Sequence, residues 1–525
     1  MGRFIENINF ANDLKNLKNE TPSFTNNMNY IGISCGFHDA ALSIVDVHGD
    51  ILFAGHSERY SKQKHTKDLC WDLVTDALSH TKYSYNEIHY YERPWMKFLR
   101  QLRTGEGSKL TNLSAKEIIG PNLVHKLQDG RGGKIHTHNH HLSHAAAGFQ
   151  TSPFNDATVV VIDAIGEFDT ITIWDARYDK IGVAKYTKLY TLKYPDSIGL
   201  FYSAMTKRVG LRPLDEEYIL MGMAAYGEST LYKQMHDELI DDSNELRFKH
   251  NLHIGVPDDF LEGANDMDIA SASQVMVENL IRTVMRKARF HSKSRNLVYG
   301  GGVALNCLAN RFLGEYFDNV WIMPNPGDAG SSLGASALGY GRKINFNNCF
   351  IGRNISGPYP VNGLLDKLLS DRMVGVANGR AEFGPRALGN RSLLADPRGK
   401  DIKDKVNQIK RRQQFRPFAP VILEEMADKY FYMPHNWHTH NYMQSVAICR
   451  FPNLYPAICH ADGTSRVQTV PKDGSGIREL LEKWYVLTEC PMLLNTSLNI
   501  RGEPMVNDRN DADRFETLYG IKVLS

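Results

Sequence analysis

The sequence predicts an α/β protein with two domains. Two stretches are typical of a strand, a short glycine-containing turn and a second strand, and two others combine a glycine-rich segment with a following helix. The first pattern joins antiparallel strands, and the second is common in nucleotide-binding folds. At 525 residues the chain is also too long for one ordinary core, because domains usually have roughly 100–200 residues.

The N-terminal half begins with a predicted three-stranded meander. Residues 30–35, 40–47 and 51–56 are apolar segments of strand-like composition, and short turns separate them. The first turn places His38 and Asp39 at its tip.

The same device returns later in the chain. Residues 157–163 form another apolar strand, and a turn at residues 164–167 leads to the alternating strand 170–174. We therefore expect one strand-turn-strand unit to be used twice.

Glycine-rich segments mark the end of the first domain. A helix is predicted over residues 269–289 and a strand over 296–299, which runs into the glycines at 300–302. A second glycine-rich break at 325–330 precedes a helix of small residues at 331–340. This order of strand, glycines and helix is typical of a nucleotide site.

A linker is predicted at residues 343–359, which are rich in asparagine and glycine, and a new strand series starts at 373–377. We therefore predict an N-terminal extension at 1–28, a first domain at 29–345 and a second domain at 355–525.

Composition narrows the class of protein. Apolar residues make up 42% of the chain and charged residues 23%, as in well-packed globular proteins, and the net charge of +2 gives only weak steering toward polyanions. The seven cysteines are scattered and never spaced as CxxC, which favours a reducing, cytoplasmic compartment. No apolar run approaches the roughly 20 residues of a membrane span. We expect a soluble monomer or homodimer without a membrane partner.

The run His140-His-Leu-Ser-His144 is a candidate metal site. In a helix the first and last histidines project from one face, whereas His141 points elsewhere. A histidine-rich surface helix is the alternative. A metal ion needs a further ligand, and Asp328, between two small residues, is a suitable carboxylate. Its alternative role is to cap the helix that follows.

Asp163 ends an apolar strand, a position from which acidic side chains meet a nucleotide's phosphates or its metal ion. An ordinary turn aspartate is the alternative. Glycines near it and near the later breaks leave amide groups accessible to adenosine and phosphate, although such a run could also be a simple loop. The predicted nucleotide-binding residues are Asp163, Gly166, Gly301, Gly302, Asn306 and Gly330.

Arginines of the C-terminal half are interleaved with glycine and proline. Guanidinium groups bind phosphate in a bidentate manner, and a loop framework can present several of them to one phosphorylated substrate. A solvated basic surface is the alternative. The arginines in question include Arg386, Arg391 and Arg416.

Motifs in one order across the chain resemble those of the NodU/CmcH carbamoyltransferases, from about Tyr30 to about Asn507. The motifs are GFHD from Gly36, HHLSHA from His140, VVVIDAIGE ending at Glu167, GGVALN from Gly301, NPGDAGSSLGA from Asn325, GRAEFGPRALGNRSLLADPR from Gly379, FRPFAP from Phe415, DGTSRVQ from Asp462 and LLNTSLNIRGEP from Leu493.

The resemblance implies an actin-like ATPase domain of the ASKHA superfamily, similar to the tRNA threonylcarbamoylation enzyme, followed by an α/β domain similar to its YrdC partner. The second domain would form a carbamoyl-adenylate from the co-substrates ATP and carbamoyl phosphate, with Mg²⁺ accompanying ATP. The first would transfer the carbamoyl group to an acceptor hydroxyl. His140, His144 and Asp328 would hold a divalent metal ion, for which iron is expected.

The resemblance also implies roles for other residues. His38, oriented by Asp39, would remove the proton of the acceptor hydroxyl, whereas its alternative is a turn histidine that bonds only to backbone. Arg386, Arg391, Arg416, Asn495 and Ser497 would bind carbamoyl phosphate. The acceptor side would be lined by Glu58, Arg59, Lys64 and His65, for which ion-paired surface residues are the alternative.

The chain departs from the family pattern at a few positions. Ile219 and Ala225 stand at the usual lysine and proline places, Gln413 where an acid is common and Leu498 where phenylalanine is usual. Any ligand contact by that lysine is therefore in doubt.

The acceptor is expected to be a sugar or other small natural product, or a hydroxymethyl base such as 5-hydroxymethylcytosine in DNA. Lys97, Arg100, Arg103 and Lys109 in residues 95–109 could steer a polyanion, although an amphipathic surface helix is the favoured interpretation. A threonylcarbamoyl-type tRNA-modifying enzyme and an actin-like sugar kinase are the alternative functions. The kinase leaves the histidine motif and the second domain unexplained, and the tRNA enzyme would lack that domain.

Overall fold

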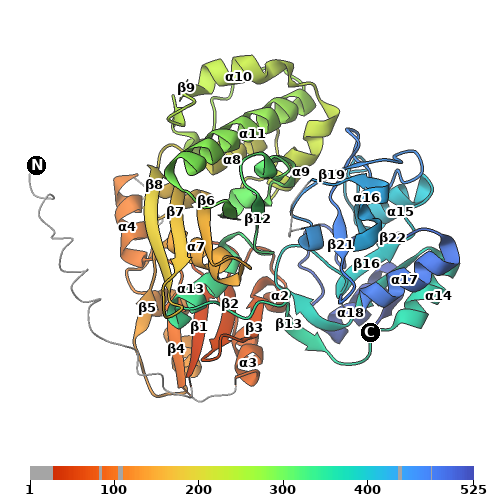
Figure 1. The fold of residues 1–525 in the computed structure, drawn as a ribbon, viewed down its shortest axis with the longest axis horizontal. Coiled ribbons are helices and arrows are strands. Elements are labelled where there is room, and N and C mark those ends of the chain that lie inside the picture. Colours follow the sequence, from red (N-terminus) through yellow and green to blue (C-terminus); the bar gives the residue numbers. More distant parts are fainter. Residues whose placement is uncertain (1–27, 82–84, 105–109, 435–439, 475) are drawn as a thin grey trace, which may run out of the picture.

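The fold is mixed α/β, as predicted. The computed structural model describes residues 28–81, 85–104, 110–434, 440–474 and 476–525. Figure 1 shows the described residues from 28 to about 340 as two sheets with helices beside and above them, and the described residues of the last third of the chain as a separate group of strands and helices at one side.

The first sheet has the strand order β3-β2-β1-β4-β5. Strand β1 pairs antiparallel with β2 and parallel with β4, so a meander occupies one side of the sheet and parallel strands the other. Met28, which we had placed in the extension, is the first residue of β1. The strands are β1 (Met28–Ser34), β2 (Ala41–Asp46), β3 (Ile51–His56), β4 (Tyr85–Tyr90) and β5 (Ile135–Thr137).

The second sheet repeats this arrangement in the order β12-β11-β6-β7-β8. Strand β6 pairs antiparallel with β7 and parallel with β11, as β1 does with β2 and β4. The repeated unit expected from the sequence is therefore present in both sheets. The strands are β6 (Asp156–Gly166), β7 (Asp169–Tyr178), β8 (Ala184–Lys193), β11 (Asn296–Gly300) and β12 (Asn319–Trp321).

Two helices of small residues, α7 (His140–Thr151) and α13 (Ser331–Tyr340), pack against each other between the sheets. Helix α7 lies on β6 and β11, and α13 lies on β1 and β2. A Cβ atom on Gly334 would lie 1.8 Å from the carbonyl oxygen of Ser143, so the two backbones approach closely only because that residue is glycine. This contact fixes the histidines of α7 beside the loop that precedes α13.

Further helices cover the N-terminal half. The longest, α11 (Asp266–His291), begins at Asn265, whose side chain accepts a hydrogen bond from the N–H of Met267. The other elements are α2 (Glu58–Ser61), α3 (Trp71–Ser79), α4 (Pro94–Arg103), α5 (Ala115–Ile119), α6 (Pro121–Leu127), α8 (Ile198–Arg208), α9 (Glu217–Met223), α10 (Tyr232–Leu239), β9 (Ile240–Asp242), β10 (Arg247–Phe248) and α12 (Cys307–Asn310).

The C-terminal half is organised around a six-stranded sheet with the order β21-β17-β22-β16-β14-β23. Its strands are β14 (Met373–Ala377), β16 (Arg391–Ala395), β17 (Ala419–Leu423), β21 (Gln468–Val470), β22 (Met492–Ser497) and β23 (Val523–Leu524), and the helices are α14 (Val361–Asp371), α15 (Asp401–Ile409), α16 (Ala427–Tyr430), α17 (Ile477–Thr488) and α18 (Arg509–Tyr519). A three-stranded sheet holds β18 (Phe431–Tyr432), β19 (Ala447–Cys449) and β20 (Thr464–Ser465).

One prediction about the linker is wrong. Within residues 343–359, strand β13 (Phe350–Ile355) pairs antiparallel with β15 (Gly379–Glu382), so part of this segment belongs to regular structure. Among the described residues, no sheet combines strands from before residue 345 with strands from after residue 350.

Across the described part of the chain, every helix is too short or too polar to cross a lipid bilayer.

Candidate metal centre and cation cluster

Four buried side chains converge where the two sheets meet. His140 and His144 come from α7, Asp163 from β6 and Asp328 from the turn before α13. One ligand atom of each lies within 4.8 Å of the others, and we call these four residues the histidine group.

The spacing of the histidine group suits a metal ion. The two histidine Nε2 atoms are 3.1 Å apart, and each lies 3.1–3.4 Å from a carboxylate oxygen of Asp163 and of Asp328. Ligand atoms about 2.1 Å from one tetrahedral ion would lie roughly 3.4 Å apart. The group therefore has the donor types and the size of a divalent metal site.

The outer ring atoms of the two histidines point their inner atoms toward such an ion. His144 Nδ1 lies 3.1 Å from the carbonyl oxygen of Pro326, and His140 Nδ1 lies 3.6 Å from a carboxylate oxygen of Glu92. These acceptors favour a proton on Nδ1 and leave the Nε2 lone pair facing inward. Two lone pairs at 3.1 Å repel each other, and a bound cation would remove that conflict.

The charges of the histidine group are strongly coupled. Burial opposes ionisation of His140, but Asp328 and Asp163 hold the pKa of its imidazole well above the ordinary value. Burial likewise opposes ionisation of Asp163, but His140 and His144 hold its carboxyl pKa well below the usual range. The two carboxylates therefore stabilise positive charge at this point, carried either by the imidazoles or by a bound metal ion.

The side chains of Asp328 and Asp163 contact the histidines, and neither acts only as a helix cap or a turn residue. Asp328 makes no side-chain cap to the helix that follows, because its carboxylate faces the histidines. Asp163, which we had expected beside the nucleotide, belongs to the histidine group through Oδ2, while its Oδ1 accepts hydrogen bonds from the N–H groups of Ala164 and Gly302.

At three of the positions predicted for nucleotide contact, close packing within the protein already requires glycine. A Cβ on Gly166 would lie 2.4 Å from the His140 ring, one on Gly301 2.2 Å from the Ile162 oxygen, and one on Gly330 1.7 Å from the Asn325 oxygen. These glycines therefore let the histidine group and its flanking loops pack closely.

Asn306 is committed to internal bonds. Its side chain caps α12 through the N–H of Ala309 and exchanges two hydrogen bonds of 3.1 Å with Gln274. These bonds hold the Asn306 side chain in place, and its contact with a nucleotide stays a prediction.

His38 and Asp39 lie beside the histidine group, at the tip of the first turn. His38 Nε2 is 3.9 Å from Asp328 Oδ2, and its Nδ1 is 3.0 Å from Asp39 Oδ2. Asp39 has a φ of 53°, a left-handed conformation that aspartate tolerates better than most residues. The arrangement places an imidazole at the edge of the candidate metal site.

A hydrogen-bonded chain continues from Asp39 toward α9. Asp39 Oδ1 lies 2.7 Å from His65 Nδ1, and His65 Nε2 lies 2.9 Å from Asp215 Oδ1, which also accepts from Lys64. Glu58 accepts from the N–H of His65. Three of the four predicted acceptor-side residues, Glu58, Lys64 and His65, are thus grouped next to His38.

The pKa values along this chain follow from its contacts. Burial opposes the charge on His65, but Asp215 and Asp39 raise the pKa of its imidazole to about 10. Burial also opposes the charge on Asp39, but His38 and His65 hold the pKa of its carboxyl well below its usual range.

The prediction for Arg59 is wrong. Its guanidinium is buried and donates to the carbonyl oxygens of Glu382, at 2.5 Å, and Gly384, at 2.7 Å. Arg59 therefore ties the N-terminal half to the C-terminal half and does not face an acceptor.

The prediction for Arg391 is also wrong. The side chain is completely buried, and all three guanidinium nitrogens donate to main-chain carbonyl groups. The acceptors are the carbonyl oxygens of Arg353, Asn378, Gly379, Asn390 and Asn507. No donor is left for a phosphate, so Arg391 stabilises the loops around it.

Arg386 and Arg416 belong instead to a concentration of cations. Burial first, and then the charge of Arg466, lowers the pKa of the Arg386 guanidinium to about 9. Burial and nearby arginines also lower the pKa values of Arg412, Arg416 and Lys410. We call Arg386, Lys410, Arg412, Arg416 and Arg466 the cation cluster.

The cation cluster has no carboxylate partner among the described residues. The buried Nε atoms of Arg386 and Arg466 have no hydrogen-bond acceptor, and the guanidinium of Arg416 lies 4.7 Å from the ring centroid of Tyr218. Lys410 is buried and the four arginines are partly buried, and cations withdrawn from water without a carboxylate are costly, so the cluster is suited to an anion such as phosphate.

Sequence reasoning missed Lys410, Arg412 and Arg466. The signal was present, because all three stand in or beside the motifs FRPFAP and DGTSRVQ.

Asn495 and Ser497 lie on β22 beside the cluster. Ser497 accepts from Lys410 Nζ at 3.1 Å, whereas Asn495 donates to the Ala387 oxygen and to Gln468. The carbonyl oxygen of the buried Asn495 amide has no donor, so it remains available to a ligand amide.

Helix α4 corrects the prediction of a basic surface. Lys97 and Arg100 are buried, Arg103 is exposed, and Lys109 lies outside the described residues. Lys97 Nζ donates to Glu92 at 2.9 Å. Two of the four basic residues predicted to steer a polyanion are therefore turned into the protein.

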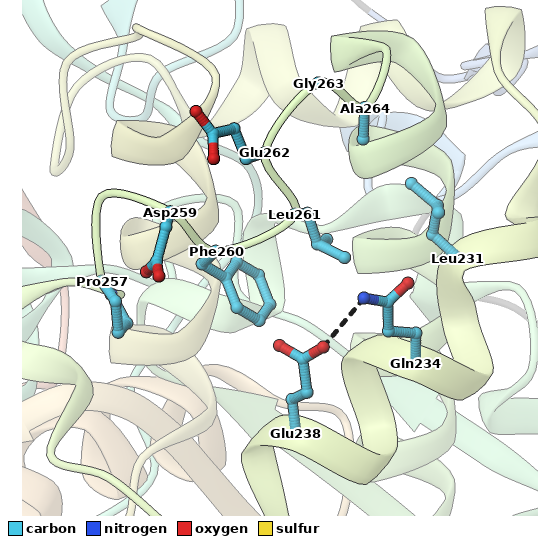
Figure 2. Close-up of a pocket in the computed structure, with 10 residues that line it drawn as sticks. All are labelled: Leu231, Gln234, Glu238, Pro257, Asp259, Phe260, Leu261, Glu262, Gly263 and Ala264. Carbon is cyan, nitrogen blue, oxygen red and sulfur yellow. Dashed lines mark hydrogen bonds between the residues drawn. The ribbon is translucent and has the colours of Figure 1, made fainter.

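A separate hollow of about 560 Å³ lies between α10 and residues 257–264 (Figure 2). Exposed carboxylates of Glu238, Asp259 and Glu262 border it, and Glu238 already accepts from Gln234. None of the predicted site residues lines this hollow, so it is distinct from the histidine group and the cation cluster.

Comparison with known proteins identifies relatives along most of the chain. Residues 98–337 match the family model described as Carbamoyltransferase N-terminus, and residues 365–525 match Carbamoyltransferase C-terminus. An uncharacterised protein of Synechocystis is 32% identical over 92% of this chain and 93% of its own length. Nodulation protein NolNO of Sinorhizobium fredii is 29% identical over 90% and 76%, and nodulation protein NolO of Bradyrhizobium diazoefficiens is 31% identical over 71% and 75%.

Proposed function

The chain belongs to the carbamoyltransferase family, and we propose that it is an ATP-dependent O-carbamoyltransferase acting through a carbamoyl-adenylate. The observation that carries the proposal is the presence, in one chain, of a buried group suited to a metal ion and a partly buried cation cluster suited to phosphate. The two would serve successive half-reactions.

We propose that residues 29–345 form the transfer domain and residues 355–525 the activating domain. The repeated sheet order of the N-terminal half supports an actin-like fold, in which two similar sheets enclose a nucleotide site. The YrdC-like assignment of the C-terminal half rests on the sequence motifs alone.

The activating half-reaction needs anion binding. Carbamoyl phosphate loses phosphate to water and leaves carbamate, whose oxygen then attacks the α-phosphorus of ATP. The product is a carbamoyl-adenylate, and pyrophosphate with its Mg²⁺ leaves. Arg386, Arg416 and Arg466 would neutralise the phosphate charge in both steps, while Asn495 and Ser497 would hold the carbamoyl amide.

The transfer half-reaction needs an activated hydroxyl and a stabilised leaving group. The acceptor oxygen attacks the carbamoyl carbon, its proton leaves, and AMP departs with the bond electrons. A divalent ion, for which we propose iron, would supply charge stabilisation at the AMP phosphate when bound by His140, His144, Asp163 and Asp328. Gly301 and Gly302 follow strand β11, and the N–H of Gly302 donates to Asp163. These two glycines would face the nucleotide.

His38 is suited to accept the acceptor's proton. Its Nδ1 faces Asp39, which leaves Nε2 directed toward Asp328 and the histidine group. A carboxylate behind an imidazole fixes the tautomer and stabilises the imidazolium that forms on proton transfer. Asp39 would therefore orient His38, and His65 would in turn hold Asp39.

The decisive experiment follows ATP in the presence of the purified chain. Carbamoyl phosphate should make ATP yield AMP and pyrophosphate, and an alcohol acceptor should gain the mass of one carbamoyl group. Formation of ADP, or no response to carbamoyl phosphate, would contradict the carbamoyl-adenylate mechanism.

The acceptor is proposed to be a small-molecule alcohol, with a hydroxymethyl base in DNA as the other candidate. A mass-shift screen should include sugars, other natural-product alcohols and 5-hydroxymethylcytosine DNA. Light scattering of the same preparation distinguishes a monomer from a homodimer.

A further inference from the structure

Tyr218, the second residue of α9, lies between cations that come from both halves of the chain. The guanidinium carbon of Arg416 lies 4.7 Å from the centroid of the Tyr218 ring, and Nζ of Lys64 lies 5.7 Å from it. Arg416 belongs to the cation cluster, and Lys64 donates to Asp215 just before α9. In Figure 1, α9 lies at the side of the N-terminal half that faces the C-terminal strands. A residue of the N-terminal half therefore reaches the candidate phosphate site.

A second tyrosine of the same segment fixes the backbone beside Arg416. Tyr226, in the turn that follows α9, donates from its hydroxyl to the carbonyl oxygen of Phe415 at 2.7 Å. The ring centroids of Tyr226 and Phe415 are 5.4 Å apart, and a Cβ atom on Gly222 would lie 3.7 Å from the Phe415 ring. Because Phe415 immediately precedes Arg416, this segment contacts both the guanidinium of Arg416 and the backbone next to it.

The contact with Arg416 is made by an aromatic ring, although two carboxylates directly precede Tyr218 in the sequence. Glu216 accepts from Arg501 at 2.6 Å, and Glu217 accepts from Ser203 at 2.7 Å. Within the described part of the chain, both carboxylates form their ion pairs and hydrogen bonds outside the cation cluster. The side chain that meets the cluster is therefore the neutral one.

A neutral ring is suited to hold a cation that must later bind phosphate. The face of an aromatic ring attracts a guanidinium group but leaves its charge in place, whereas a carboxylate would occupy the donors that phosphate needs. Burial lowers the pKa values of the Arg386 and Arg412 guanidinium groups, and Tyr218 lies close enough to both to oppose that shift. The ring thus stabilises charge in the cluster without cancelling it.

We propose that Tyr218 is a positioning residue of the activating half-reaction, whose ring holds the guanidinium of Arg416 in the orientation that binds phosphate. The activating site is then composite. The C-terminal half supplies the cations, and α9 of the N-terminal half supplies the surface against which one of them is set. This inference rests on the proposed function and deepens it, because residues 29–345 were assigned only the transfer step.

The test measures binding of inorganic pyrophosphate to the full-length chain by calorimetry, without ATP or carbamoyl phosphate. Tyr218→Leu keeps an apolar side chain but removes the ring, and it should weaken binding about 10-fold, as expected for the loss of a partly desolvated cation–π contact. Tyr218→Phe keeps the ring and should bind within about 2-fold of the wild type. No binding by the wild type, wild-type affinity in Tyr218→Leu, or equal weakening by both substitutions would overturn the proposal.

A second measurement separates positioning from general support of the fold. In a chain that already carries Arg416→Met, adding Tyr218→Leu should weaken pyrophosphate binding by no more than about 2-fold, because no cation is left for the ring to orient. If Tyr218→Leu causes the same loss with and without Arg416, the ring supports the fold and does not act through Arg416.

A third variant tests why the ring is neutral. Tyr218→Glu should weaken pyrophosphate binding more than Tyr218→Leu does, because its carboxylate would pair with Arg416 and repel the anion. Wild-type affinity in Tyr218→Glu would contradict the need for an unpaired charge. Tyr432→Leu is the matched control, because Arg450 lies 3.7 Å from the centroid of that ring, on β18. This control should not change the affinity, and a loss equal to that of Tyr218→Leu would overturn the proposal.

The outcome is separable from that of the proposed function. In acceptor-independent release of pyrophosphate from ATP and carbamoyl phosphate, Tyr218→Leu should raise the KM for carbamoyl phosphate about 10-fold and change kcat less. Absence of release by the wild type would reject the proposed function alone, because the binding measurements need no turnover. Normal release by the wild type, with an unchanged KM in Tyr218→Leu, would reject the positioning role alone.

Discussion

The histidine group is buried and the cation cluster is largely half-buried, and their charges are arranged in opposite ways. In the histidine group, two carboxylates face two histidines, and the inner nitrogen atoms are close enough to need a shared cation. In the cation cluster, four arginines and a lysine have no carboxylate within ion-pair distance among the described residues. The first is suited to a cation and the second to an anion, which fits one chain that binds a metal ion and phosphates at separate places.

The largest effect is expected when one carboxylate of the histidine group is removed. Asp328→Asn keeps the shape of the side chain but offers a weaker ligand, so metal content should fall and carbamoyl transfer should drop about 100-fold or more. Elemental analysis measures the metal, and mass spectrometry of the acceptor measures transfer.

Acceptor-independent pyrophosphate release in Asp328→Asn should stay within about 3-fold of the wild type, because the histidine group and the cation cluster share no hydrogen-bond or ion-pair partner among the described residues. Asp318→Asn, at an exposed ion pair with Arg295, is the control and should change neither quantity. Loss of both half-reactions in Asp328→Asn would show that the two regions do not act separately.

The corresponding substitution in the cation cluster removes a positive charge. Arg386→Met should lower pyrophosphate release about 100-fold, because a guanidinium that contacts transferring phosphate is worth several kcal/mol. Metal content should remain that of the wild type. Arg398→Met, which removes a partly exposed arginine paired with Asp396, is the control. Normal pyrophosphate release by Arg386→Met would mean that the cluster does not bind the reacting phosphates.

Two arginines of one motif sharpen the comparison further. Arg391 satisfies five main-chain carbonyl groups, so Arg391→Met should lower the free energy of unfolding by about 3 kcal/mol in urea titrations. Arg386→Met should leave this free energy unchanged or raise it, since it removes an unpaired buried charge. If both substitutions destabilised the protein equally, Arg386 would be structural like Arg391.

The pair also shows what a sequence can and cannot predict. Both arginines stand in GPRALGNRS with similar neighbours, and we assigned both to phosphate binding. Their roles differ because strand β13 with Arg353 and the loop with Asn507, both distant in sequence, fold around Arg391 and supply acceptors for it. Local pattern identifies the type of residue, whereas the partner is decided by tertiary contacts.

Features that depend on regular residue spacing were predicted more reliably than the partners of single arginines. His140 and His144 converge because helical geometry alone puts them on one side of α7, and the strand-turn-strand units appear where alternation and glycine turns indicated them. The periodicity of α4 indicated two sides but not which one faces inward. That was settled by Glu92 and Glu167, which bind Lys97 and Arg93.

The smallest expected effect concerns pH and the residues that hold His38. The pKa of His65 is about 10 in the folded protein, against an ordinary value of 6.5, because Asp215 and Asp39 outweigh burial. A raised pKa means that the charged form stabilises the fold. This stabilisation is complete below pH 6.5 and is lost as the pH rises toward 10.

The variant His65→Gln separates this contribution from every other titrating group. Glutamine keeps a donor and an acceptor but carries no charge toward Asp39, Asp215, Glu58 and Lys64. The wild type should be more stable than the variant at pH 6 in urea titrations, and the gap should narrow at pH 9.5, because the imidazolium has begun to lose its proton. His236→Gln controls for the same exchange on α10. A gap of equal size at both pH values would mean that His65 contributes hydrogen bonds without charge, and Asp39 would then be held in place by geometry alone.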